Sequence, residues 1–408
     1  MMSATEAPDR QRVTHTQLRE ILDAHLKFTL SKPGGRRAAL QFHDLSGLIM
    51  AGSNLKGADF TGASLVGADL SQCNLDEAVF FAADLTEANL EGTRLVGADL
   101  RGCRLRGAVL VRANLHRADL REGSITKRVK GGNLSRMTTD LGAADLTGAD
   151  VSEAYAAQTD FTDAIMVGCQ LSRTDLRSAN LSGVNLQGAN LNGANLTGAK
   201  LKDAILTGAK MENADLSGAS MAGALTDKPQ GRTVAQLEKP IPEMLRLHDL
   251  WVRTSGREGA VCDLSDVDLR GGPSLDGMHL TGLVARNTVF YGISMRGISL
   301  QGARLQGADM RGCRMDGADL RGANLTGARL NFADLRDADV SPLILPGNRL
   351  FPSVLDNAVL RRADLRGAKL TRAKLSGADL TEAQLHNTDF EGAVTEGAKM
   401  PATKRRAA

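Results

Sequence analysis

The side chains of this 408-residue sequence that could bind a metal ion or transfer a proton are its five cysteines, seven histidines and 47 acidic residues. Metal and catalytic sites need such side chains at characteristic spacings, for example the CxxC pairs of zinc sites. The sequence contains no CxxC pair, no matched histidine spacing and no phosphate-binding loop that ends in Lys-Ser or Lys-Thr. We therefore expect no catalytic residue, no metal site and no cofactor, and a protein that is not an enzyme.

The cysteines and acids instead follow a period of five residues. Each cysteine precedes a large apolar residue by two positions, as Cys73 precedes Leu75, and most aspartates directly precede such a residue, as Asp69 precedes Leu70. A repeat of this kind places carboxylates near one another automatically, so their proximity does not indicate acid–base catalysis. We predict that the cysteines act as small buried apolar side chains.

The five-residue repeat alternates a small residue, a polar residue and a large apolar residue, and glycine commonly follows two positions later. In an extended segment such alternation places residues two apart on one side, and the recurring glycine permits a sharp bend before the next unit. Four bent sides would close a coil of about twenty residues, and coils stacked about 4.8 Å apart would pair their backbones. The sequence therefore predicts an all-β solenoid whose narrow interior holds every fifth side chain, including Leu70, Leu90 and Leu110.

The consecutive units ADFTG, ASLVG and ADLSQ, which begin at Ala58, resemble the A(D/N)LxG pattern of the pentapeptide-repeat family. The resemblance covers roughly residues 38–226 and 260–400 and is carried by many units in phase. It implies that the chain folds as a right-handed quadrilateral β-helix in two arrays.

Two similar stretches precede the arrays, LDAHLKF at residues 22–28 and LRLHDLW at residues 245–251. The open ends of a solenoid expose unpaired backbone and apolar side chains, so we interpret both stretches as short α-helical caps. His25 and His248 hold equivalent positions in them, which predicts a hydrogen bond from each helix to the solenoid. The predicted organisation is a flexible N-terminus (1–15), a helical cap and turn (16–37), the first β-helix (38–226), a linker (227–242), a second helical cap (243–259), the second β-helix (260–400) and a basic tail (401–408).

Residues 126–140 interrupt the first array with a basic, glycine-rich segment. Counting the large residues across it gives one coil plus one extra residue, so we interpret it as an irregular coil, bulged or looped, within a continuous tube. Its basic side chains either belong to a solvated loop or contact a partner. The candidate contact residues here are Lys127, Arg128 and Lys130.

Residues 341–353 interrupt the second array and contain three prolines. They also bring Leu343, Ile344 and Phe351 to a wall that should be polar. This irregular segment is either a looped-out corner or an exposed contact surface. In the second case these three apolar residues are the candidate contacts with a partner.

The balance of charge restricts the partners. The sequence has 50 Lys and Arg against 47 Asp and Glu, which gives a net charge of +3. Along one predicted wall of the second array, every twentieth residue reads Asp309, Arg329, Arg349 and Lys369. Because the charges along the walls alternate and mostly compensate, we expect neither direct binding of nucleic acid nor an acidic stripe that would mimic it.

Two functions are considered. The first is a non-catalytic scaffold or protein–protein interaction module that presents rigid β-helix faces to a macromolecular partner. The second is implied by the resemblance, because a subset of pentapeptide-repeat proteins mimics DNA and binds a bacterial type II topoisomerase, gyrase. Such a DNA-mimic-type modulator needs an acidic stripe, so the compensated charges favour the scaffold.

The sequence also bears on location and assembly. It contains no run of about 18 apolar residues, so no transmembrane segment is expected. An odd number of cysteines, five, is typical of a reducing compartment and not of a disulfide framework. We therefore expect a cytoplasmic protein with a protein partner whose identity is unknown, and a homo-oligomer is compatible with the sequence. The family resemblance implies that the protein is bacterial.

Overall fold

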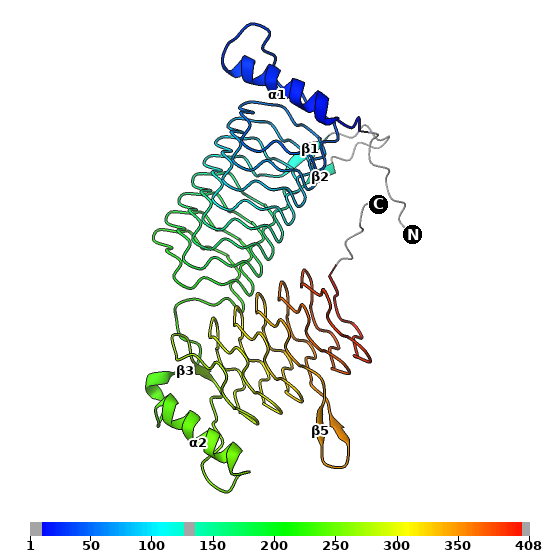
Figure 1. The fold of residues 1–408 in the computed structure, drawn as a ribbon. Helices are drawn as coiled ribbons and strands as arrows, with labels where there is room; N and C mark the ends of the chain where they lie inside the picture. Colours follow the sequence, from blue (N-terminus) through cyan, green and yellow to red (C-terminus); the bar gives the residue numbers. More distant parts are fainter. Residues whose placement is uncertain (1–9, 126–134, 402–408) are drawn as a thin grey trace. The chain divides into compact units, whose positions relative to one another are not determined.

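The computed structural model describes residues 10–125 and 135–401 and divides into two compact units. The first unit ends at Asp227 and the second begins at Lys228. In each unit the chain winds through a series of stacked coils, and an α-helix lies beside the first coil (Figure 1). The two units therefore share one plan of construction, a helix followed by stacked coils.

Successive coils pair their backbones in parallel at residues 20 positions apart, as Asp59 pairs with Val79. The next residue, Phe60, donates its N–H to the carbonyl of Val79 at 2.7 Å. The corner that follows is closed by the N–H of Ala63, which donates to the carbonyl of Phe60 at 2.9 Å, and Gly62 adopts a φ of 64° there. Glycine takes this left-handed conformation without a steric penalty. The predicted coil of about twenty residues with glycine at its corners is confirmed.

The large apolar side chains fill the interior of the coils. Leu70, Leu90 and Leu110 are each no more than 1% exposed. The rings of Phe60 and Phe80 stack with their centroids 4.8 Å apart, which matches the spacing of neighbouring strands in a sheet. Small residues occupy the remaining inward positions because a larger side chain would not fit beside these ladders. The predicted inward and outward positions are therefore confirmed.

In each unit an α-helix lies near the start of the chain and beside the first coil (Figure 1). The helix α1 spans His15–Thr29 and starts with a capping box, in which the side chains of Thr14 and of the residue three positions later each accept a bond from the other's N–H. The helix α2 spans Ile241–Arg253. Leu18 of α1 and Leu245 of α2 are buried in the cores of their own units.

The expectation of a flexible segment up to residue 15 is wrong for Arg12 and Val13. Arg12 pairs in parallel with Asp44 of the first coil, and the N–H of Val13 donates to the carbonyl of Asp44 at 3.0 Å. The side chain of Val13 is buried. An open coil edge carries unpaired backbone groups, and this short segment provides partners for some of them.

The segment expected as a linker at 227–242 also carries regular structure. The strand β3 (Arg232–Thr233) pairs in parallel with β4 (Val267–Asp268), and the 3₁₀ helix η1 (Val234–Gln236) follows β3. The helix α2 then begins two residues earlier than the predicted cap, because the prolines at its start suit the first turn, where backbone N–H groups have no partner within the helix.

A hairpin interrupts the first unit. Its strands β1 (Gly123–Ile125) and β2 (Ser135–Met137) are antiparallel. Arg104 pairs with Asp140, 36 positions further along the chain in place of the usual 20. The prediction of one extra residue in this coil is therefore wrong, because the added chain leaves the wall as a hairpin and rejoins it at the next corner.

A second hairpin projects from the second unit (Figure 1). Its strands β5 (Leu343–Leu345) and β6 (Arg349–Phe351) are antiparallel. Asn324 pairs with Val354, so ten residues are added to the usual coil of 20. Of the two interpretations of residues 341–353, the looped-out corner therefore describes the path of the backbone.

This insertion corrects one of the predicted walls. The series Asp309, Arg329, Arg349 and Lys369 assumed an unbroken spacing of twenty residues. In the structure Arg329 pairs with Val359, while Arg349 lies in the hairpin. The added residues shift the register of every later coil relative to the sequence.

Candidate functional site

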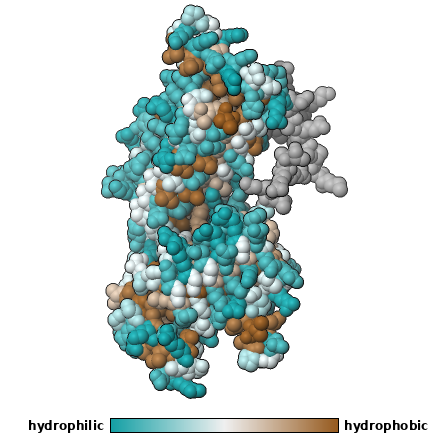
Figure 2. Space-filling model, in the orientation of Figure 1, coloured by the Kyte–Doolittle hydropathy of each residue, from teal (hydrophilic) through white to brown (hydrophobic). Residues whose placement is uncertain are grey.

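The hairpin β5–β6 carries apolar side chains on both of its faces. Leu343 and Phe351 form one register pair, and Ile344 and Leu350 form the next. The first pair lies over the coil wall at Gly322, where an added Cβ would come within 2.9 Å of both side chains. The second pair faces solvent, with Ile344 66% and Leu350 48% exposed. The hairpin therefore forms an exposed apolar patch on the face of the second unit that Figure 2 shows.

The candidate contact residues have different surroundings. Ile344 is exposed, whereas Leu343 is half-buried and Phe351 contributes one edge of its ring to the wall and the rest to solvent. Leu350 was missed from the sequence, although its pairing with Ile344 follows once the hairpin register is known. The basic candidates Lys127, Arg128 and Lys130 lie outside the described residues.

A hydroxyl side chain closes the base of each hairpin. Thr139 accepts a hydrogen bond from the N–H of Gly102 and donates one to the carbonyl of Arg121, both at 2.8 Å. Ser353 accepts one from the N–H of Gly322 at 2.8 Å and donates one to a carbonyl at the start of its hairpin at 2.9 Å. At Gly322 the bond to Ser353 takes the place of a backbone bond to the next coil, whereas the N–H of Gly102 also donates to the carbonyl of Arg121 at 3.2 Å. They tie the base of each hairpin to the wall.

Carboxylates that stand two positions before an arginine form bidentate ion pairs with it. Arg101 donates Nε to one oxygen of Asp99 at 2.9 Å and Nη2 to the other at 2.7 Å, and Arg321 binds Asp319 with the same distances. The same arrangement occurs in Asp119–Arg121, Asp175–Arg177, Asp334–Arg336 and Asp364–Arg366. The hydrogen bonds from Arg336 hold the pKa of Asp334 below its ordinary value, although burial opposes them. These acids are therefore neutralised locally, as the alternating charges of the sequence predict.

The two cap histidines join helix to coil. His25 accepts a hydrogen bond at Nδ1 from the N–H of Ala38 at 2.9 Å, and His248 accepts one from the N–H of Cys262 at 3.0 Å. Both histidines are fully buried, and burial lowers the pKa of each imidazole. The predicted hydrogen bond from each helix to its solenoid is confirmed.

The five thiols are all buried at inward positions, as predicted. The thiol of Cys73, for example, lies 3.0 Å from the carbonyl oxygen of Met50. Burial raises the pKa of the Cys73 thiol to about 11 and the pKa values of Cys169 and Cys262 to about 12. A buried thiol that holds its proton is a poor nucleophile.

We expect Ellman's reagent to react with none of the five cysteines of the folded protein at pH 8 and with all of them after unfolding in guanidinium chloride. The absorbance of the released thiolate measures both reactions. A thiol that reacts within minutes in the folded protein would contradict the buried inward position of the cysteines.

Residues 10–125 and 135–401 contain no group of three His, Cys, Asp or Glu side chains arranged to hold a metal ion. Within the same residues, neither α1 nor α2 combines the length and the apolar character that a helix needs to cross a membrane. The features that remain to be considered for a functional site are the projecting hairpin, the walls of the coils and a pocket beneath α2.

Comparison with known proteins points to one family. The comparison with curated proteins finds no match. A family described as pentapeptide repeats matches in eight copies and covers more than half of the chain. The matched residues are 40–76, 83–121, 139–177, 179–223, 303–341 and 354–394.

Several solved structures are similar to this chain. HetL, a pentapeptide repeat protein involved in heterocyst differentiation regulation from the cyanobacterium Nostoc sp., is 22% identical, with 95% of this chain and 97% of that chain covered and a TM-score of 0.20. A pentapeptide repeat protein from the cyanobacterium Cyanothece is 35% identical over 32% of this chain and 88% of that chain, with a TM-score of 0.24. Full-length QnrB1, a plasmid-mediated fluoroquinolone resistance protein, is 21% identical over 46% of this chain and 84% of that chain, with a TM-score of 0.18.

Proposed function

Since this chain belongs to the pentapeptide repeat family, we propose that it is a non-catalytic interaction module that presents rigid walls to a protein partner. Pentapeptide repeat proteins fold as right-handed quadrilateral β-helices and are generally not enzymes. We extend this fold to both units and assign α1 and α2 as the caps of the two β-helices. A stack of coils holds its surface side chains at fixed intervals, which suits recognition of another macromolecule.

The hairpin β5–β6 is the observation that carries this proposal. Ile344 and Leu350 expose apolar surface on a segment whose base the bonds of Ser353 tie to the coil wall. Preorganised apolar side chains bind with a small loss of conformational entropy, and a few such residues commonly supply most of the affinity of an interface. We therefore assign Ile344 and Leu350 as the centre of the contact, with Phe351 beside them.

This assignment is tested by placing a photo-crosslinking amino acid at position 344, identifying the captured protein and purifying it. The affinity of the intact chain for that protein is then measured by calorimetry. We expect Ile344→Asp to weaken binding by about tenfold or more, because a carboxylate would replace an apolar contact at the centre of the interface. The melting temperature should not change, since the side chain is exposed.

Ile49→Asp is the matched control. Ile49 is 67% exposed in the first unit, against 66% for Ile344, so the same change is made at an equally exposed isoleucine. Binding by Ile49→Asp should equal that of the unaltered chain. Equal affinities for all three proteins would exclude the hairpin as the contact surface.

The pairing of carboxylates with arginines argues against DNA mimicry. A protein that occupies a DNA-binding groove must offer uncompensated negative charge to the lysines and arginines of that groove. Asp99 and Asp319 instead each hold an arginine in a bidentate pair. We therefore do not propose gyrase as the partner.

A further inference from the structure

Large apolar side chains are exposed at the C-terminal end of α1. Leu26 is 45%, Phe28 46% and Leu30 52% exposed. Helix residues four positions apart share one flank, whereas residues two positions apart lie on nearly opposite flanks. Leu26 and Leu30 therefore lie on one side of α1 and Phe28 on the other. The exposed apolar surface is convex and surrounds the end of the helix.

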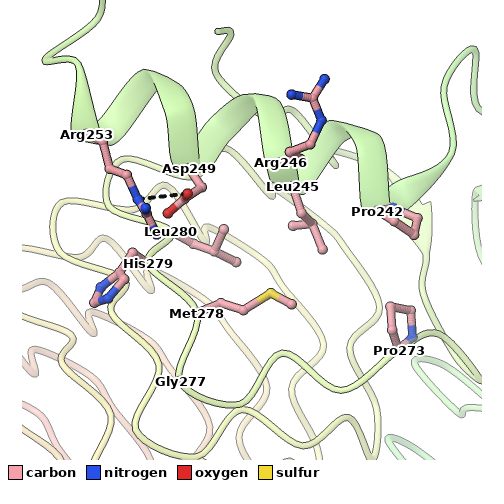
Figure 3. A pocket seen from close by; sticks show the side chains of 10 residues that line it. All are labelled: Pro242, Leu245, Arg246, Asp249, Arg253, Pro273, Gly277, Met278, His279 and Leu280. Carbon is pink, nitrogen blue, oxygen red and sulfur yellow. Dashed lines mark ion pairs between the residues drawn. The ribbon is translucent and has the colours of Figure 1, made fainter.

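The second helix shows that a cap does not need apolar side chains at these positions. When α1 and α2 are aligned on their buried histidines, Leu26 corresponds to Asp249 and Leu30 to Arg253. Arg253 forms an ion pair with Asp249 through Nε at 2.9 Å. Figure 3 shows this pair at one end of a pocket between α2 and its first coil, which has one residue more than the usual 20. Two leucines therefore stand on α1 where an ion pair suffices on α2.

The turn that follows α1 folds back onto the end of the helix. The N–H of Lys32 donates to the carbonyl of Lys27 at 2.8 Å, which is one of the two bonds of a Schellman cap. The N–H of Arg36 donates to the carbonyl of Ala24 at 3.0 Å. Gly35 packs so closely that an added Cβ would come within 2.4 Å of the helix backbone. The turn therefore brings Lys32 and Arg36 beside the apolar end of the helix.

This end of the first unit is strongly basic. Residues 24–43 contain Lys27, Lys32, Arg36 and Arg37 and no acidic residue, and the two acids of α1, at positions 20 and 23, precede this segment. Arg37 donates its Nε to a carbonyl of the first coil at 2.6 Å. None of the four cations forms an ion pair with another residue that the structure describes. The exposed apolar side chains are therefore surrounded by uncompensated positive charge.

We propose that the C-terminal end of α1 and the turn after it bind the surface of an anionic lipid bilayer. Leu26, Leu30 and the exposed part of Phe28 enter the boundary between the head groups and the acyl chains, and Lys27 and Lys32 bind the anionic head groups beside them. Apolar insertion and electrostatic attraction are each weak here, and together they give a reversible attachment.

The shape of this surface favours a bilayer over an acidic segment of a protein. A protein segment docks its apolar side chains in a groove or pairs with an exposed strand edge. Leu26, Phe28 and Leu30 instead surround a convex helix end. Lipid head groups rearrange around a convex apolar group, so a bilayer needs no complementary groove on this chain. The hairpin β5–β6 belongs to the other unit and takes no part in this contact.

The test is co-sedimentation of the full chain with vesicles of phosphatidylcholine, with and without phosphatidylglycerol. We expect the partition coefficient to be at least about tenfold higher on the vesicles that contain phosphatidylglycerol, and to fall as salt is added. No binding to the anionic vesicles, or equal binding to both kinds of vesicle, would overturn the proposal. Binding of polyglutamate without binding of vesicles would assign the surface to an acidic protein and would overturn it as well.

A double variant tests the apolar contribution without changing the net charge. Leu26→Asp combined with Leu30→Arg installs the ion pair of α2 on α1, so the variant should keep the melting temperature of the unaltered chain. We expect its partition onto the anionic vesicles to be about tenfold weaker or less, because the side chains that enter the lipid are lost. Partition equal to that of the unaltered chain would exclude the end of α1 as the membrane contact.

A second double variant tests the charge. Lys27→Gln combined with Lys32→Gln should weaken partition onto the anionic vesicles by about tenfold or more, since each cation near an anionic surface contributes about 1 kcal/mol. Lys200→Gln combined with Lys202→Gln is the matched control, because it removes two exposed lysines from a coil wall of the same unit. This control should bind as the unaltered chain does. Equal losses for the two pairs would mean that overall charge, and not the end of α1, governs binding.

Discussion

Leu110→Ala is expected to lower the free energy of unfolding by about 2–5 kcal/mol, the range for leucine truncation in protein cores. Leu110 is fully buried, and its N–H pairs with the carbonyl of Asp145 in the next coil at 2.6 Å. The surrounding coils hold one another through such bonds on every side, so they cannot close over the cavity without breaking their own pairing. We therefore expect the first unit to lose the full free energy of stabilisation that an unfilled cavity costs.

The adjacent residue provides the control for Leu110→Ala. Val109 faces outward and is 37% exposed, although it lies in the same coil and next to Leu110 in the chain. Val109→Ala should change the free energy of unfolding by no more than about 0.5 kcal/mol. Guanidinium titrations followed by circular dichroism measure both. Similar losses for the two variants would contradict the division between interior and surface.

The side chains in the interior of the coils could be predicted because the residue types within each five-residue unit are sufficient to identify the inward positions. The alternation of small, polar and large residues states which side chain faces inward without reference to any distant part of the chain. Leu70 and Leu90 therefore lie where the repeat places them. The same holds for the cysteines, whose position two before a large residue fixes them in the interior.

The length of the first insertion could not be predicted from the sequence, because one apolar residue of the hairpin stands at the five-residue spacing of the repeat. Ile125 stands five residues after Leu120, so it extends the pattern, yet it lies in the strand β1. The coil itself resumes at Leu141. A period reports only spacing along the chain, whereas departure from the wall depends on backbone pairing that the spacing does not encode.

The sequence could predict that the second hairpin carries apolar contact residues, but it could not predict which of them face solvent. Three prolines and apolar residues on a polar wall indicated an unusual surface at 341–353. Which residue faces solvent depends on the antiparallel register, which pairs Ile344 with Leu350. The pocket beneath α2 depends in addition on how the helix lies over an irregular coil, and no local pattern in the sequence describes that packing.

Acidification from pH 7.5 to pH 5 is expected to destabilise the contact between α2 and its coil. His248 must be unprotonated at Nδ1 to accept the bond from Cys262. Burial lowers its pKa from the ordinary 6.5, against the opposing effect of the carbonyls of Leu280 and Thr281. Below pH 6.5 the unfolded state therefore binds more protons than the folded state, so the stability that is present above this pH is lost as the pH falls.

Trp251, the single tryptophan of the chain, reports this transition. Its ring stacks on His248 with the centroids 5.7 Å apart. His248→Phe keeps an aromatic ring but leaves the N–H of Cys262 unpaired, which should cost about 1–3 kcal/mol at pH 7.5. In this variant the tryptophan emission should no longer change between pH 7 and pH 5.

His279→Asn, at an exposed histidine of the same unit, should retain the pH dependence. If His248→Phe and the unaltered chain titrate alike, then a group other than His248 governs the acid response, and the hydrogen bond to Cys262 does not hold the cap in place.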